Sequence, residues 1–133
     1  MDFWLLLARL CCGAVWCYEG LWQKILRPDA HETQIVAHFH FLGLSGGALS
    51  AFIGALEVLL ALGFWSGLLP KLVGWTGCVA LLLMNLVGIF GSGEIASPLG
   101  LLIKNTPLWF CMALIATQGA GWWALKLPFL QSK

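Results

Sequence analysis

Charged side chains are scarce in this chain. Aspartate, glutamate, lysine and arginine make up only 10 % of the 133 residues, whereas hydrophobic residues make up 60 %. Soluble domains carry about a quarter charged residues, so the composition excludes an ordinary water-soluble domain. The net charge is only +1 and the sequence has no basic run, which excludes a surface suited to nucleic-acid phosphates. The sequence therefore predicts a protein whose main partner is the lipid bilayer.

Sequence features of secreted and metal-binding proteins are also missing. The first hydrophobic segment has no basic n-region, is too long for a signal peptide and is followed by no small-residue cleavage site, so we expect it to be retained as a membrane helix. The five cysteines include no CxxC pair, and no Cys/His spacing is typical of a zinc site. His38 and His40 are two positions apart and would face away from each other on a helix. The sequence predicts no metal site.

Four segments are long and apolar enough to cross a bilayer, which takes about 20 helical residues. They cover residues 3–26, 46–64, 71–90 and 107–125. Between the first two, Asp29 and Glu32 have the spacing of a capping box and predict a short helix at 30–42, lying at the membrane interface. We expect an all-α fold, with one integral membrane domain built as a bundle of four transmembrane helices plus this interfacial helix. Both termini then lie on one side, and the lysine and arginine balance slightly favours the cytoplasm.

Polar residues interrupt these spans and form the candidate site. An ionisable group inside a span costs several kcal/mol, roughly, unless it faces a protein interior, a water pocket or another charge. By α-helical spacing, Trp16, Glu19 and Gln23 share one face of the first span, while Glu57 lies near the middle of the second. We expect polar side chains from separate spans to converge on one pocket. The predicted ligand-binding residues are Arg9, Trp16, Glu19, Gln23, Glu57 and Asn85.

Three roles fit such a set. The residues can hold the polar headgroup of an apolar ligand, relay protons across the membrane, or form a clasp of hydrogen bonds that only stabilises the bundle. The sequence contains no phosphate-binding loop, nucleophile triad or cofactor fingerprint, and it predicts no catalytic residue.

The order and spacing of several short motifs resemble the DoxX-like family of small four-helix membrane proteins. The motifs are Arg9 with Trp16, Tyr18–Leu21, Lys24–Leu26, Glu32, Gly54 with Glu57, Met84–Asn85 before Gly88, Pro98–Gly100 and Asn105. The resemblance covers nearly the whole chain. It implies a four-helix bundle in a bacterial inner membrane, and some members of the family are linked to quinone-coupled sulfur oxidation or accompany redox enzymes.

The polar set and the resemblance together leave three hypotheses open. The first is a non-catalytic or accessory membrane subunit of an oxidoreductase, which binds a quinone or another lipid-like ligand in a polar pocket and docks a redox enzyme subunit. The second is a small proton-coupled transporter that uses Glu19 and Glu57. The third is a purely structural membrane interaction protein. The sequence leaves open whether the chain forms a homo-oligomer.

Overall fold

The computed structural model describes residues 1–28, 45–91 and 97–125, and in these ranges the regular structure is entirely helical. The first long helix consists of α1, Asp2–Cys17, and its continuation η1, Tyr18–Leu26, which is wound as a π-helix. It is followed by α3, Gly46–Ser66, α4, Pro70–Leu86, the short π-helix η3, Val87–Gly91, and α5, Pro98–Gln118. Among the described residues, four helices are long and apolar enough to cross a membrane, which confirms the predicted four-span fold. The predicted helix at 30–42 lies outside the described residues.

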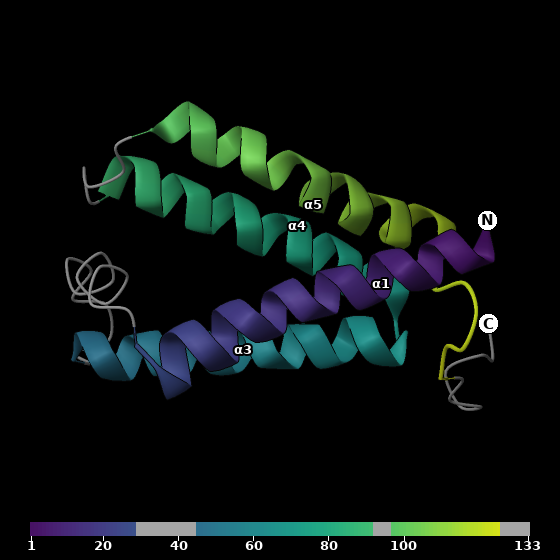
Figure 1. Cartoon of the computed structure of the whole chain (residues 1–133), viewed down its shortest axis with the longest axis horizontal. Coiled ribbons are helices and arrows are strands. Elements are labelled where there is room, and N and C mark those ends of the chain that lie inside the picture. Colours follow the sequence, from purple (N-terminus) through teal and green to yellow (C-terminus); the bar gives the residue numbers. More distant parts are fainter. Residues whose placement is uncertain (29–44, 92–96, 126–133) are drawn as a thin grey trace.

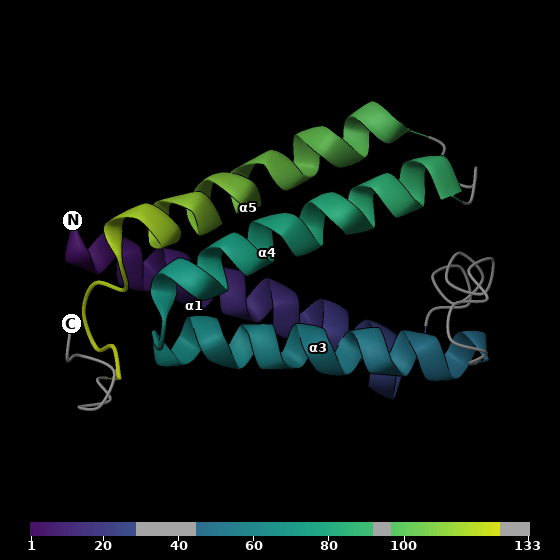
Figure 2. The same cartoon turned by 180° about the vertical axis from the view of Figure 1, so that it is seen from behind.

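The helices form two pairs that meet like the arms of a V. The first long helix packs against α3, whereas α4 packs against α5. Figures 1 and 2 show the pairs close together at the end that holds the N-terminus and diverging toward the opposite end. The last described residues lie at the closed end, where Trp122 N–H donates to Asp2 O and Leu125 N–H donates to Ser66 O.

An apolar core joins the arms where they meet. Its buried members come from all four long helices: Ala8, Cys12, Trp16, Ala61, Phe64, Leu81, Met112 and Ile115. Trp16 links the two arms directly, because its Nε1 donates to Met112 Sδ at 3.4 Å. Lipid tails are as apolar as these side chains, so close van der Waals packing rather than exclusion from water holds such a core together.

The second half of the first helix crosses α3 so closely that the two backbones are in contact. A Cβ atom at Gly20 would lie 2.5 Å from Gly54 O, and one at Gly54 would lie 2.7 Å from Gly20 O. Only glycine fits at both positions, and small residues that face each other let membrane helices approach closely. This contact fixes η1 against α3 along the diverging part of the bundle.

The fourth helix begins and ends earlier than the sequence predicts. The predicted range 107–125 is corrected to Pro98–Gln118. Ser97 caps the helix, with its Oγ accepting from Gly100 N–H at 3.3 Å, and proline suits the first helical position because its missing N–H would have no partner there. Pro107 lies inside the helix, which membrane helices tolerate because neighbouring groups satisfy the freed carbonyl. Gly119, with φ of +97°, follows the last helical residue.

Candidate functional site

A lysine and a glutamate pair inside the bundle, on the arm formed by the first helix and α3. Lys24 Nζ, from η1, lies 3.0 Å from Glu57 Oε2, from α3, and each side chain is 4 % exposed. A Cβ atom at Gly54 would lie 2.9 Å from Lys24 Cβ, so the glycine makes room for the lysine. Two charges removed from water are tolerable only when they compensate each other. The pair therefore places a polar, electrically balanced centre among apolar side chains.

Two asparagines form a second polar pair on the other arm. Asn105 Nδ2, from α5, donates to Asn85 Oδ1, from α4, at 2.8 Å. Asn85 is only 3 % exposed, and its Nδ2 has no hydrogen-bond partner among the described residues. A buried amide donor without a partner is uncommon in native proteins, where almost all buried polar groups are satisfied. The second pair therefore leaves one hydrogen-bond donor available inside the bundle.

Both pairs lie beyond the apolar core, toward the diverging end of the bundle. Glu57 comes one turn before the core residue Ala61 on the buried face of α3, and Asn85 comes one turn after the core residue Leu81 on the buried face of α4. Because α3 and α4 run in opposite directions (Figure 1), both steps lead toward the diverging end, by about 6 Å each. Ser50, also buried, lies two further turns along the same face of α3 and its Oγ has no partner in the described part of the chain.

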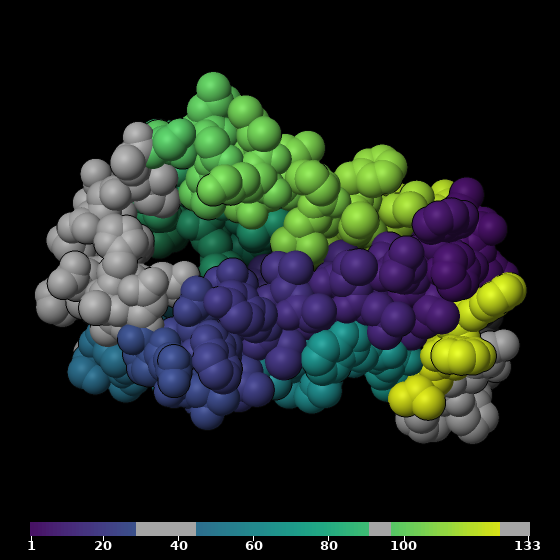
Figure 3. All heavy atoms as spheres, in the orientation of Figure 1, coloured from purple at the N-terminus to yellow at the C-terminus, as the bar shows by residue number. Residues whose placement is uncertain are grey.

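The surface is hollowed in the diverging part of the bundle. Figure 3 shows a depression between α5 and the first helix, with atoms of α4 seen behind it. The hollow lies where the two arms of the V separate (Figure 1). The described helices therefore cover the interior less completely there than at the closed end, although Lys24, Glu57 and Asn85 themselves are at most 4 % exposed.

Arg9 lies at the closed end, away from the two polar pairs. Its five N–H groups donate to five main-chain carbonyls, those of Phe64, Trp65, Ala120, Trp122 and Trp123, at 2.6 to 3.5 Å. Phe64 is two turns from Glu57 along α3, about 10 Å by helical rise. The predicted convergence of Arg9 with Glu57 is therefore not observed. Arg9 instead ties the last turn of α3 to the segment that follows α5.

The other predicted residues of the first helix are distributed differently from the sequence expectation. Trp16 is buried in the core, whereas Glu19 and Gln23 are half-buried. Both lie in η1, and a π-helix has a wider turn than an α-helix, so the α-helical spacing that aligned them with Trp16 does not hold there. Gly20 and Lys24 take the buried face of η1 instead.

Lys24 and Asn105 are site residues that the sequence reasoning missed. Lys24 lies near the end of the first span, where a lysine ordinarily extends its ammonium to the interface. The sequence analysis placed Asn105 in the loop between the third and fourth spans, because the predicted fourth span began only at residue 107. A signal was present for each, since both belong to the short motifs on which the family resemblance depends.

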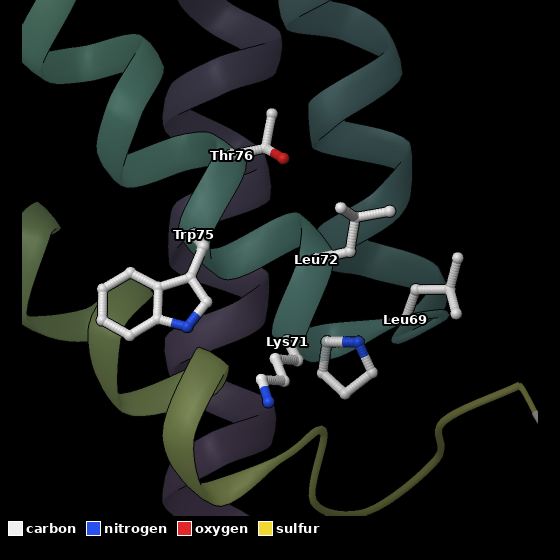
Figure 4. A pocket seen from close by; sticks show the side chains of 6 residues that line it. Leu69, Lys71, Leu72, Trp75 and Thr76 are labelled. Carbon is white, nitrogen blue, oxygen red and sulfur yellow. The ribbon is translucent and has the colours of Figure 1, made fainter. Parts of the chain in front are cut away.

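Surface grooves are found elsewhere, on the lipid-facing side. Figure 4 shows one at the start of α4, where Lys71 and Trp75 lie beside Leu69 and Leu72. A second is lined by residues of the first helix together with Trp65. Neither contains a residue of the two polar pairs, and apolar grooves of this kind are ordinary on a surface that faces acyl chains. Within the described ranges, no group of three or more His, Cys, Asp or Glu side chains is placed to hold a metal ion; His38 and His40 lie outside those ranges.

Comparison with known proteins identifies one family. The sequence model of the DoxX-like family matches residues 13–115, well over half of the chain. The matched range contains both polar pairs but begins after Arg9. No curated protein and no solved structure matches the chain.

Proposed function

The chain belongs to the DoxX-like family, and its described part has four helices fit to span a membrane; from this premise we propose that it binds the polar headgroup of a lipid-like molecule between its two polar pairs. Lys24 and Glu57 border the site on one arm, and Asn85 and Asn105 border it on the other. The apolar part of the ligand extends between the diverging arms toward the acyl chains of the bilayer.

The unpartnered amide of Asn85 is the observation that carries this proposal. Leaving a buried donor without a partner costs about 1–3 kcal/mol, and a ligand oxygen at this position removes that penalty. The buried ion pair on the other arm supports the same conclusion, because ionisable groups inside membrane bundles mark substrate and ion pathways. A pure clasp between helices would use the donor of Asn85 as well as its acceptor.

A quinone is the ligand that we propose. Its ring carbonyls accept hydrogen bonds, and its isoprenoid chain suits the apolar space beyond the polar pairs. By the same proposal, the protein is a non-catalytic subunit that holds the quinone for a redox enzyme. We place it, by the same proposal, in a bacterial inner membrane.

Solvent extraction of the purified protein tests the proposal. The wild-type chain, purified in detergent, should release a quinone or another lipid-like molecule that mass spectrometry detects, and added quinone should raise its melting temperature. Asn85→Leu should lose both effects, whereas Gln118→Leu, which removes an exposed amide at the end of α5, should keep them. Absence of any co-purifying molecule together with an unchanged melting temperature would overturn the proposal.

A proton-coupled transporter is the second candidate, and the ion pair between Lys24 and Glu57 favours it. A carboxylate that exchanges its ammonium partner for a proton can couple proton movement to substrate movement. Glu57→Gln should then abolish substrate-driven proton flux in liposomes, and Glu19→Gln tests the other predicted carboxylate. Flux that is unchanged in both variants removes this candidate. Variants that lose stability without any ligand or flux phenotype identify the polar pairs as a structural clasp.

A further inference from the structure

The hydroxyl of Ser50 is buried on the same face of α3 as Glu57. Ser50 is 1 % exposed, and its Oγ has no hydrogen-bond partner among the described residues. We propose that this hydroxyl is a second partner for the ammonium of Lys24, which turns to it when Glu57 no longer carries a negative charge. The inference goes beyond ligand binding at Asn85 and does not depend on it. It supplies a step that the transporter candidate requires, because an ammonium displaced from Glu57 by a proton needs another partner inside the bundle.

The conformation of Ser50 leaves its oxygen available. Serine and threonine hydroxyls inside helices commonly donate to a main-chain carbonyl three or four residues earlier. Ser66 donates in this way to Gly63 O at 3.1 Å. Thr106 does the same to Leu102 O at 2.9 Å. Ser50 makes no such bond within the described part of the chain, and its oxygen therefore keeps both lone pairs for a donor such as an ammonium.

The root of the Lys24 side chain lies between Ser50 and Glu57. A Cβ atom at Gly54 would lie 2.9 Å from Lys24 Cβ. Ser50 comes four residues before Gly54 and Glu57 comes three residues after it, both on the buried face of α3. Side chains at these spacings have Cβ atoms about 5–6 Å apart, so the root of Lys24 is at a similar distance from each. Lys24 Nζ reaches Glu57 Oε2 at 3.0 Å, and the same flexible four-carbon stem is long enough to reach Ser50.

Ser50 is also closer than Glu57 to the end of the helix. It lies four residues after Gly46, the first residue of α3, which is about 6 Å by helical rise. A buried ammonium without a countercharge is costly, and long side chains lower that cost by carrying the charge toward the membrane interface. Lys24 therefore pairs with Glu57 while the carboxylate is charged and turns toward Ser50 when the carboxylate is neutral.

A double-mutant cycle on the full chain in detergent tests this second partner. In the wild-type background, Ser50→Ala should leave the equilibrium constant of unfolding unchanged or lower it, because the substitution removes a buried hydroxyl without a partner. In the Glu57→Leu background, the same substitution should raise that constant about tenfold or more, because it then removes a hydrogen bond to a charged group. The Lys24→Met/Glu57→Leu background is the matched control, in which Ser50→Ala should again behave as in the wild type.

Two results of this cycle overturn the inference. If Ser50→Ala has the same effect in the wild-type and Glu57→Leu backgrounds, the ammonium goes elsewhere, to Glu19 on its own helix or to the interface. If the tenfold effect persists in Lys24→Met/Glu57→Leu, Ser50 stabilises the bundle without Lys24. Neither result changes the release of a lipid-like molecule from the purified protein, so the inference and the proposed function fail separately.

Relocating the carboxylate decides the question if Glu57→Leu does not fold. The variant Ser50→Asp/Glu57→Leu places the countercharge at the proposed second partner of Lys24. It should recover a folded protein with a cooperative melting transition, because the ammonium reaches the new carboxylate. A variant that stays unfolded shows that Lys24 does not reach position 50 and overturns the inference.

Discussion

Lys24 and Glu57 meet inside the membrane-spanning part of the protein, with Nζ 3.0 Å from Oε2. They come from two helices whose backbones touch at Gly20 and Gly54, so the pair is held by the tightest helix crossing on its arm. This crossing, the asparagine pair and the arginine at the closed end each lead to a separate prediction.

Removing one member of the ion pair should destabilise the protein more than removing both. Lys24→Met leaves the Glu57 carboxylate buried without its countercharge, which costs about 3–5 kcal/mol, whereas apolar replacement of a whole buried pair is often neutral. The double variant Lys24→Met/Glu57→Leu should therefore be more stable than Lys24→Met alone. Chemical unfolding in detergent measures both, with Lys71→Met on the exposed start of α4 as the control. A double variant less stable than either single variant would contradict the pairing.

The crossing of η1 and α3 should not tolerate an added methyl group. Gly54→Ala places a Cβ 2.7 Å from Gly20 O, and overpacking of this kind costs about 1–3 kcal/mol. Gly47→Ala, on the same helix with nothing within 4 Å of the new atom, should be neutral or stabilise by up to about 1 kcal/mol, the helix propensity difference. Thermal melting in detergent compares the two. Equal melting temperatures would show that the helices do not touch at Gly54.

Arg9→Lys should loosen the closed end although it keeps the charge. A guanidinium presents five donors in a rigid plane, and an ammonium presents three. At least two of the five bonds to main-chain carbonyls are lost, and each bond to a charged group contributes about 1.5–3 kcal/mol. We expect a lower melting temperature and faster proteolysis within residues 119–125. Arg27→Lys, at an exposed position, should change neither the melting temperature nor the rate of proteolysis. An Arg9→Lys variant that resists proteolysis as well as the wild type would show that Arg9 does not hold the closed end together.

Replacing both asparagines should stabilise the ligand-free protein while removing its binding. Asn85→Leu/Asn105→Leu eliminates the unsatisfied buried amide, and apolar replacement of both hydrogen-bond partners is nearly neutral or stabilising. We expect the free energy of unfolding to be unchanged or higher by about 1 kcal/mol, with loss of the melting shift on adding quinone. A marked loss of stability in the ligand-free double variant would instead identify the asparagine pair as a structural clasp.

The sequence was sufficient to predict the helices and two of the four residues in the polar pairs. Hydrophobic length alone locates four spans, and the burial of Glu57 and Asn85 follows from the energy of exposing such groups to lipid. The start of the fourth helix was predicted too late, at residue 107, because the cap-and-start signal at Ser97 and Pro98 was missed. That single misplacement put Asn105 in a loop and concealed its pairing with Asn85.

The positions of the Lys24 and Arg9 side chains could not be predicted from each span taken alone. Each lies near the end of its helix, where a long side chain can reach the interface, yet Lys24 turns inward to Glu57 and Arg9 binds main-chain carbonyls. Their positions depend on contacts with α3 and with the segment after α5, which are distant in sequence. The π-helical winding of η1 also changes which residues share a face. The hydrophobic periodicity of the first span does not predict this winding.

Photo-crosslinking with a quinone that carries a diazirine on its ring tests the central claim most directly, the claim that two arms of the bundle serve one ligand. The wild-type protein in detergent is labelled, digested and sequenced by mass spectrometry. The account predicts label on both arms, close to Lys24 or Glu57 on one and close to Asn85 or Asn105 on the other, with competition by unlabelled quinone. Label confined to the lipid-facing groove at 69–76, or label that does not decrease under competition, would contradict it.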